Sequence, residues 1–162
     1  LPLARVGPAM AAPRSVAYGI GRIGCFRAGD GTYGTPTDLP WGMAFPNGVV
    51  PVNVPVHPVQ LYEAAGAFLI AGILWALGRR LRPLAVFGSY LLLSGAARLL
   101  AEVVRINPHV LLGLTEAQLI GIVSIILGVA LILRDAFHPA VAPSDAPVGS
   151  ESAVLSSHPV GR

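Results

Sequence analysis

Two ionisable residues interrupt a long apolar stretch and are the first candidates for chemistry in this sequence. The stretch 85–105 is long enough to cross a bilayer as a helix, yet it contains Arg98 and Glu102. These two lie on one helical face, with Ser94 one turn before them and Arg105 about one turn after. Charged groups at membrane depth are costly and usually face a bundle interior or a wet cavity. We therefore expect a functional site on this face; the alternative is an Arg98–Glu102 ion pair that only joins helices.

A second group of polar residues lies where another apolar stretch begins. His57, Gln60, Tyr62 and Glu63 are gathered in the segment HPVQLYE, which opens the apolar run 57–78. The proline in this segment fits the first turn of a helix, where its missing N–H costs nothing. We therefore expect these side chains to lie together at one end of a helix, beside the loop that precedes it.

The composition excludes most soluble classes of protein. Of 162 residues, 54% are hydrophobic and only 12% are charged, against about 25% charged in an ordinary soluble domain. All eleven basic residues are arginines, and they form no cluster resembling a nucleic-acid surface. A single cysteine, Cys25, excludes an intrachain disulfide and a cysteine-based zinc site. The sequence therefore predicts a membrane protein that does not bind nucleic acid.

Four apolar segments predict an all-α, polytopic transmembrane helix bundle. Three spans are clear, at 57–78, 85–105 and 119–133. Residues 1–26 form a less regular N-terminal span, because three arginines interrupt it, so we expect a broken or protein-buried helix there. Thr115 and Gln118 fit a capping box before the last span. The transmembrane domain is expected over residues 1–135, followed by a disordered tail over 136–162 that is rich in Pro, Ser and Ala.

The long segment between the first two spans is predicted to be an ordered loop at the membrane surface. Residues 27–56 are dense in Gly, Pro, Asp and Asn, which favour turns, while Tyr33, Trp41 and Phe45 suit the membrane–water interface. The arginines at 79–82 and Arg134 indicate cytoplasmic ends by the positive-inside rule. The loop, the 57–63 segment and the charged end of 85–105 would then share the outer face.

At this point the chain resembles the prolipoprotein diacylglyceryl transferase family of bacteria. The resemblance runs in order from Gly19 to roughly Gly128, through four blocks of compatible spacing. These are GRIGCF at 21–26 with the following YG, PTD and PWG; HPVQLYE at 57–63; Arg98 with EVVR at 102–105; and GLT at 113–115 with Gln118.

The resemblance implies an enzyme of the bacterial plasma membrane, with its active face outward and its C-terminal tail in the cytoplasm. Such an enzyme moves an sn-1,2-diacylglyceryl group from phosphatidylglycerol to the lipobox cysteine thiol of a prolipoprotein. A thioether forms, glycerol phosphate leaves, and no metal or other cofactor is used. The expected partners are therefore phosphatidylglycerol, the prolipoprotein signal peptide and membrane lipid.

The residue types fit that chemistry. The planar fork of arginine matches a phosphodiester, so Arg22 and Arg98 are candidates for binding phosphate and stabilising the charge that builds on it. Glu102 could orient Arg98. The thiol must lose its proton, and His57 is a candidate for that transfer, although it could simply cap the helix.

The resemblance also implies a set of binding residues, each with a simpler alternative. Asp30 lies nearest the family's loop glutamate but could be an ordinary turn residue, and Gly34 could serve a backbone turn. Tyr62 and Glu63 could be an interfacial anchor and a first-turn charge. The last member of the set is Arg105.

The chain also departs from the family pattern. Cys25 stands where the family has Asn, and Ser94 stands where Tyr is common. The family has about three further N-terminal spans, including a His-Gly-Gly motif, so we expect a divergent, N-terminally truncated member. A non-catalytic phospholipid-binding or assembly protein on the same scaffold is the alternative function. A solute or ion pathway is less favoured, because the charges gather at one end only.

Overall fold

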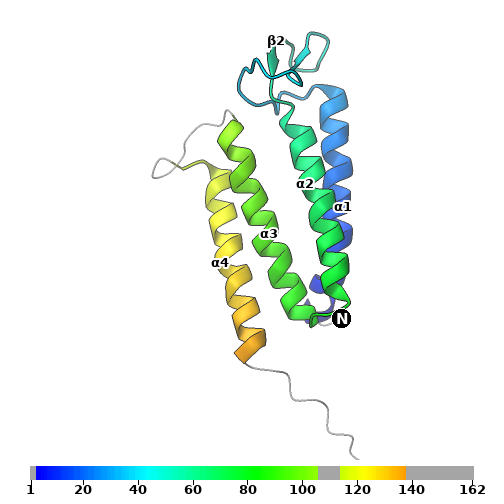
Figure 1. Ribbon diagram of the computed structural model, residues 1–162, viewed down its shortest axis with the longest axis vertical. Helices are drawn as coiled ribbons and strands as arrows, with labels where there is room; N and C mark the ends of the chain where they lie inside the picture. Colours follow the sequence, from blue (N-terminus) through cyan, green and yellow to red (C-terminus); the bar gives the residue numbers. More distant parts are fainter. Residues whose placement is uncertain (1–2, 106–113, 138–162) are drawn as a thin grey trace, which may run out of the picture.

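The structure, a computed structural model, describes residues 3–105 and 114–137 and is a bundle of helices with a small sheet at one end (Figure 1). In chain order the elements are α1 (Leu3–Ala28), β1 (Met43–Phe45), β2 (Val52–Val56), α2 (Val59–Gly78), α3 (Pro83–Val104) and α4 (Glu116–Phe137). Helices α1 and α2 lie side by side, as do α3 and α4, and α3 contacts both members of the first pair. The predicted all-α bundle is confirmed, with the sheet as an addition.

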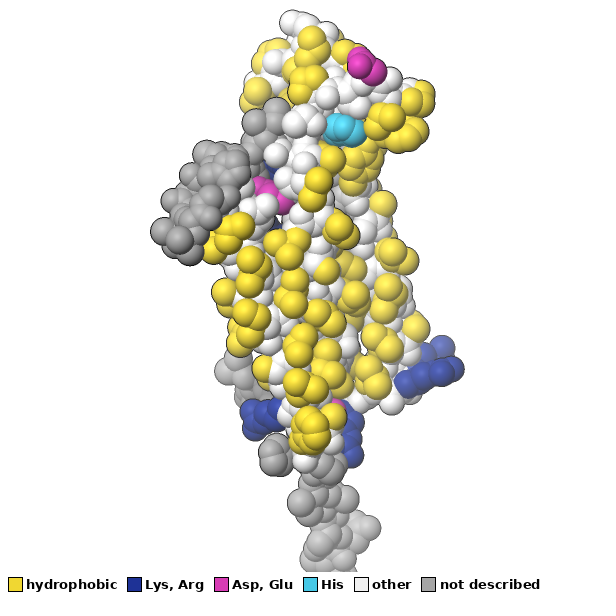
Figure 2. Space-filling model, turned by 60° about the vertical axis from the view of Figure 1, so that its left-hand side comes forward, with side chains coloured by type: hydrophobic (Ala, Val, Ile, Leu, Met, Phe, Trp, Pro, Cys, Tyr) yellow, Lys and Arg dark blue, Asp and Glu magenta, His cyan; other side chains and the backbone are white. Residues whose placement is uncertain are grey.

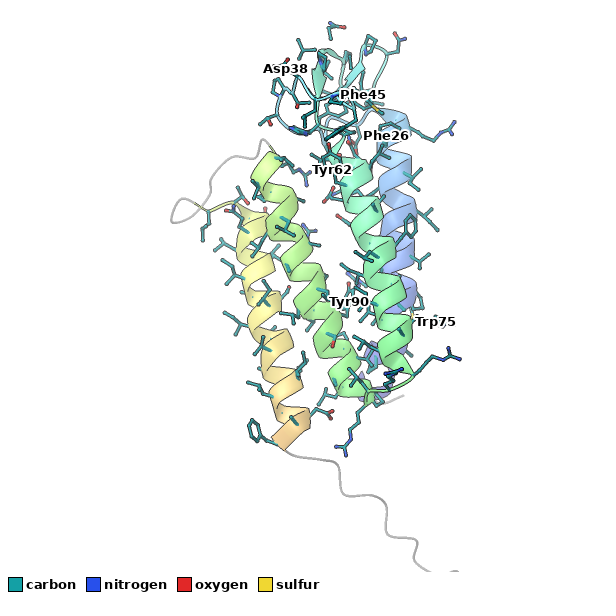
Figure 3. All side chains as sticks on the ribbon, viewed as in Figure 1. Phe26, Asp38, Phe45, Tyr62, Trp75 and Tyr90 are labelled. Atoms are coloured by element: carbon teal, nitrogen blue, oxygen red, sulfur yellow. The ribbon has the colours of Figure 1, made fainter. Side chains whose placement is uncertain are left out.

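Within the described residues, α2, α3 and α4 are each long and apolar enough to cross a membrane. Figure 2 shows a broad hydrophobic belt over the helices, with arginine side chains gathered at the end opposite the sheet. Large apolar side chains such as Leu69, Trp75 and Ile126 are exposed along this belt, and Trp75 is labelled at the edge of the bundle in Figure 3. Apolar side chains exposed on such a scale are what contact with lipid requires.

Helices α3 and α4 approach closely through two pairs of glycines. A Cβ atom on Gly95 would lie 2.6 Å from the carbonyl oxygen of Gly121, and one on Gly128 would lie 2.6 Å from that of Gly88. Each pair is seven residues, or two turns, from the other, so both fall on the same seam of this antiparallel pair. Small residues on a seam allow close backbone contact, on which packing between membrane helices depends.

Helix α1 differs from the sequence-based expectation. It runs without interruption from Leu3 to Ala28, although Pro8 and Pro13 lie inside it. The expected break is therefore absent. Its contact with α2 is close at Gly19, where a Cβ would lie 2.9 Å from the Phe68 ring. Side chains such as Met10 and Ile20 are more than half exposed in the described chain, so α1 is not enclosed by the other three helices.

Residues 27–56, called the outer segment because they lie beyond the ends of the helices, are ordered, as predicted, but their strands were not anticipated. Strands β1 and β2 pair antiparallel, while Tyr33 stacks on Phe45 with ring centroids 4.5 Å apart. Phe26, at the end of α1, meets Phe45 edge-on, as the labelled rings at the upper end of Figure 3 illustrate. This aromatic cluster fixes the segment on the end of α1.

The predicted capping box is confirmed at the start of α4. The Thr115 amide donates to Gln118 Oε1 at 3.0 Å, and the Gln118 amide donates to Thr115 Oγ1 at 3.2 Å. Helix α4 continues two residues past the predicted domain end at 135, and the tail predicted for the remainder of 136–162 lies outside the described residues.

Candidate active site

A cavity of about 800 Å³ lies between the helices and forms the centre of the candidate site. Its walls are mostly apolar and come from α1, α2 and α3, with two residues from α4. Its polar lining includes Arg14, Tyr18, Tyr62, Glu63 and Arg98. An apolar cavity with a few convergent polar groups is the usual form of a binding site for a small or lipid-like molecule.

The most developed polar cluster joins Arg22 of α1 to Glu63 of α2. Arg22 Nε lies 2.9 Å from Glu63 Oε2, and Arg22 Nη2 donates to Glu63 Oε1 at 3.1 Å. The two side chains are only 13% and 6% exposed. Tyr18 donates to the same Oε1 at 2.9 Å, and Arg105 Nη1 lies 4.0 Å from it. Glu63 is thus the carboxylate shared by two arginines, which the sequence did not indicate.

Tyr18 and Glu63 share the Arg22 guanidinium. The Arg22 Nε–H donates to the Tyr18 hydroxyl at 3.0 Å rather than to Glu63. Glu63 Oε2 is therefore close to Arg22 Nε but, among the described residues, receives no hydrogen bond although it is buried. Oε2 is nevertheless engaged by the charge of Arg22, whose Nε lies 2.9 Å away.

Arg98 lines the cavity from α3 and does not pair with Glu102. In the part of the chain that the structure describes, neither a hydrogen bond nor an ion pair joins these two side chains, so the expected orientation of Arg98 by Glu102 is not observed. Glu102 is buried, at 6% exposure, and makes another interaction.

Arg98 and Arg22 lie at matching distances from the ends of their helices. Arg98 is six residues before the end of α3, and Arg22 is six before the end of α1. Both therefore lie about 9 Å from the end of their helices that faces the sheet.

Asp30 holds the turn that follows α1. Its Oδ1 accepts from the Thr32 amide at 3.0 Å, from the Thr32 hydroxyl at 2.7 Å and from Gln60 Nε2 at 3.4 Å. Burial acts to raise the pKa of Asp30, but hydrogen bonds from Thr32, Cys25 and Gln60 outweigh it and lower the pKa to about 2. Asp30 is therefore a carboxylate at neutral pH, beside Cys25 and fully buried Gln60.

His57 and Tyr62 form a separate group under the outer segment. Trp41 Nε1 donates to the Tyr62 hydroxyl at 2.8 Å, and that hydroxyl lies 3.3 Å from His57 Nδ1. Figure 3 labels Tyr62 at the upper end of α2, below the sheet. Tyr62 also lines the cavity. The predicted proximity of His57 and Tyr62 is thus realised, and Trp41 connects them to the segment above.

Gly34 lies where the outer segment crosses the ends of two helices. Its amide donates to the His57 carbonyl at 3.0 Å, and it pairs as an isolated bridge with Arg105. A Cβ at this position would lie 2.7 Å from both His57 Cβ and the Val104 carbonyl oxygen. The absence of a side chain therefore allows the segment to reach both α2 and α3.

The structure brings most of the predicted site residues to one end of the bundle. Glu63 connects Arg22 with Arg105, and Arg98 opens on the cavity that Glu63 and Tyr62 also line. The sequence analysis missed Tyr18. Its signal was the spacing of four residues before Arg22, which places both on one face of α1.

No metal-binding cluster is present in residues 3–105 and 114–137, where groups of three His, Cys, Asp or Glu side chains suited to a metal ion do not occur. The polar chemistry of the described site rests on arginine, carboxylate, tyrosine and histidine side chains.

Comparison with known proteins gives the family. Residues 1–134 match the family model described as prolipoprotein diacylglyceryl transferase. Among similar proteins, each named phosphatidylglycerol–prolipoprotein diacylglyceryl transferase, that of Clostridium tetani is 36% identical over 127 residues, covering 76% of this chain and 51% of its own. That of Pseudomonas fluorescens is 41% identical over 140 residues, covering 81% and 51%. That of Cupriavidus metallidurans is 42% identical over 120 residues, covering 70% and 43%.

The chain spans about half the length of these curated relatives. No solved structure matches it significantly. The apolar helices and the relatives together identify a multi-pass membrane protein. With a family model matched over residues 1–134, the chain belongs to the prolipoprotein diacylglyceryl transferase family.

Proposed function

We propose that this protein transfers an sn-1,2-diacylglyceryl group from phosphatidylglycerol to the lipobox cysteine thiol of a prolipoprotein. The names of its relatives give phosphatidylglycerol and prolipoprotein as their substrates. The observation that carries the proposal is the cavity: Arg98 lines it without an ion-pair partner among the described residues, while Glu63, which also lines it, holds Arg22. An apolar cavity with arginines near one end suits a lipid whose phosphate is its only charge.

The reaction requires the thiol sulfur to bond to the glyceryl carbon that bears the phosphate. The carbon–oxygen bond breaks, its electron pair stays on the phosphate oxygen, and the thiol proton must leave. The phosphate therefore gains negative charge as glycerol phosphate departs. Groups placed where charge develops stabilise the transition state most. Arg98, and Arg22 held by Glu63, are the groups we assign to this task.

The other site residues take supporting roles in the proposal. Tyr62 lines the cavity and contacts His57, so His57 is the candidate for taking the thiol proton. Arg105 and Glu63 extend the charged cluster, while Glu102 supports α3 from its buried position. Asp30 and Gly34 form the turn and the crossing that hold the outer segment over the site.

We also propose that the protein resides in the bacterial plasma membrane with the sheet end outward and its C-terminal tail in the cytoplasm. Arg79, Arg80 and Arg82 lie at the turn between α2 and α3, and Arg134 lies near the end of α4, opposite the sheet. Positive residues at cytoplasmic ends set this orientation. Prolipoproteins would then meet the enzyme with their lipobox cysteine near the outer face.

The test is formation of the thioether on a lipobox peptide by membranes that contain the protein. Arg22→Ala and Arg98→Ala should each lower the rate about 100-fold or more, as loss of a group that stabilises developing charge does. Arg27→Ala is the matched control, because Arg27 is an exposed arginine near the same end of α1; its rate should stay within about threefold, since surface changes are usually mild. Unchanged rates in both site variants would refute the site. Binding of phosphatidylglycerol without any thioether from the wild type would favour the non-catalytic alternative.

A further inference from the structure

Trp41 approaches the candidate site from the outer segment. It lies in a turn that the Gly42 amide closes on the Leu39 carbonyl at 2.8 Å, shortly before β1. Its indole Nε1 donates to the Tyr62 hydroxyl at 2.8 Å, and that hydroxyl lies 3.3 Å from His57 Nδ1. Tyr62 lines the cavity and is labelled at the sheet end of α2 in Figure 3. A side chain of the outer segment is therefore joined to the cavity wall through one hydroxyl group.

The indole N–H decides which way the Tyr62 hydroxyl points. An indole nitrogen only donates, so the Tyr62 oxygen is the acceptor of the bond from Trp41. The hydroxyl proton then points away from Trp41, and the acceptor that the described residues offer it is His57 Nδ1. The rings of His57 and Tyr62 meet edge-on, with centroids 6.1 Å apart.

The same contacts determine where a neutral His57 carries its proton. One nitrogen of a neutral imidazole donates and the other accepts. When Nδ1 accepts from Tyr62, the proton is on Nε2. In the other tautomer, Nδ1 and Trp41 would both donate to the Tyr62 oxygen, and the hydroxyl proton would lack an acceptor among the described residues. The donors therefore run in one direction, from Trp41 through Tyr62 to His57.

This direction suits the removal of a proton from the cavity. Tyr62 lines the cavity, whereas His57 is not among the described residues that do. A thiol proton can pass to the Tyr62 oxygen while the hydroxyl proton passes to His57 Nδ1, and the sulfur electron pair then bonds to the glyceryl carbon. The Trp41 N–H stabilises the negative charge that builds on the Tyr62 oxygen in between. His57 is only half-buried, so the imidazolium can return its proton to water.

We infer that Trp41 is a positioning residue: its indole N–H directs the Tyr62 hydroxyl to His57 Nδ1, so that Tyr62 relays the thiol proton to His57. The inference rests on the proposed function for the source of that proton. The direction of the hydroxyl and the tautomer of His57 follow from the contacts of this chain alone.

The first test reads the tautomer directly, without any reaction. Trp41→Phe keeps an aromatic ring and removes the N–H. Trp75→Phe is the matched control, because Trp75 is the other tryptophan of the chain and is 72% exposed on the apolar belt. The full chain is labelled with ¹⁵N-histidine and placed in nanodiscs at a pH that keeps imidazoles neutral, and the His57 signals are identified by their loss in His57→Gln. The wild type and Trp75→Phe should carry the proton on Nε2, whereas Trp41→Phe and Tyr62→Phe should show a mixture of tautomers.

The second test measures thioether formation on a lipobox peptide. Tyr62→Phe should lower kcat about 100-fold, as loss of a proton-transfer group does. Trp41→Phe should lower kcat roughly 10-fold, as loss of one hydrogen bond does, with the KM for phosphatidylglycerol unchanged, because neither side chain is assigned to the phosphate. Adding Trp41→Phe to Tyr62→Phe should lower kcat no further, since Trp41 acts through Tyr62. Trp75→Phe should stay within about threefold of the wild type.

Four results would each overturn the inference. These are a wild-type His57 protonated on Nδ1, a tautomer that Trp41→Phe leaves unchanged, an equal loss of kcat with Trp75→Phe, and losses that multiply in the Trp41→Phe/Tyr62→Phe variant. Absence of thioether from the wild type would refute the proposed function, while the nitrogen spectra still test the role of Trp41.

Discussion

Removing the Glu63 carboxylate should destabilise the protein strongly. In Glu63→Leu, Arg22 loses its ion pair while its side chain is only 13% exposed, and Arg105 loses the same partner at 16% exposure. Breaking a buried pair by removing one member costs about 3–5 kcal/mol, because the other charge remains in a poorly solvated place. Glu63→Gln keeps the shape and part of the hydrogen bonding to Tyr18 and Arg22, so we expect about 1.5–3 kcal/mol, the range for a charge-assisted hydrogen bond.

The assay is reversible unfolding in mixed micelles with increasing SDS, followed by far-ultraviolet circular dichroism. Asp38→Asn serves as the control, because Asp38 is an exposed carboxylate of the outer segment; it should change the free energy of unfolding by less than about 0.5 kcal/mol. The double variant Arg22→Leu/Glu63→Leu should be more stable than Glu63→Leu alone, since removing both members leaves no uncompensated charge. Costs that simply add in the double variant, or a cost below about 1 kcal/mol for Glu63→Leu, would refute the reasoning.

Three further predictions concern the scaffold. Gly95→Ala should cost about 1–3 kcal/mol by overpacking, because its Cβ would lie 2.6 Å from the Gly121 carbonyl oxygen, whereas Gly72→Ala, whose Cβ meets nothing within 4 Å, should be tolerated; equal losses in the same unfolding assay would contradict this. Thr115→Ala removes one half of the capping box and should cost about 0.5–2 kcal/mol; an unchanged unfolding midpoint would argue against the cap. The lowered pKa of Asp30, about 2 against an ordinary 3.8, predicts stability that is present above about pH 3.8 and lost as the pH falls through about 2. Asp30→Asn should remove that pH dependence, and a titration curve identical to the wild type would count against it.

The helices could be predicted because their signals are local. Long apolar runs bounded by Pro, Arg and Gly gave 57–78 where the structure has Val59–Gly78, and 85–105 where it has Pro83–Val104. The Thr115–Gln118 cap was read from three residues of spacing alone. The strands were missed because they are short: β2 has five residues, with Asn53 and Pro55 among them, and both residue types are depleted in strands.

The partners of the arginines could not be predicted, because they lie on other helices. Spacing allowed the pair Arg98–Glu102 within one helix as an alternative, whereas the carboxylate that the structure places against Arg22 is Glu63, 41 residues away. A spacing of four residues places two side chains on one face, but it does not decide between pairing with each other and facing a cavity. That choice depends on how α1, α2 and α3 pack, which one sequence does not reveal. The burial of Glu102 and the opening of Arg98 on the cavity are consequences of this packing.

The outer segment is part of the site's geometry as well as its cover. The amide of Gly34 donates to the carbonyl of His57, just before α2, and the amide of Thr35 donates to the carbonyl of Val104, at the end of α3. Two consecutive residues therefore fix the ends of the two helices that carry Glu63 and Arg98. The separation of those side chains across the cavity is then set by the docking of this segment. A phosphate held between the two helices would favour the same docked state, because any ligand that binds one state better shifts the equilibrium toward it. The crossing at Gly34 and Thr35 thus connects the strands beyond it to the two helices that carry Glu63 and Arg98.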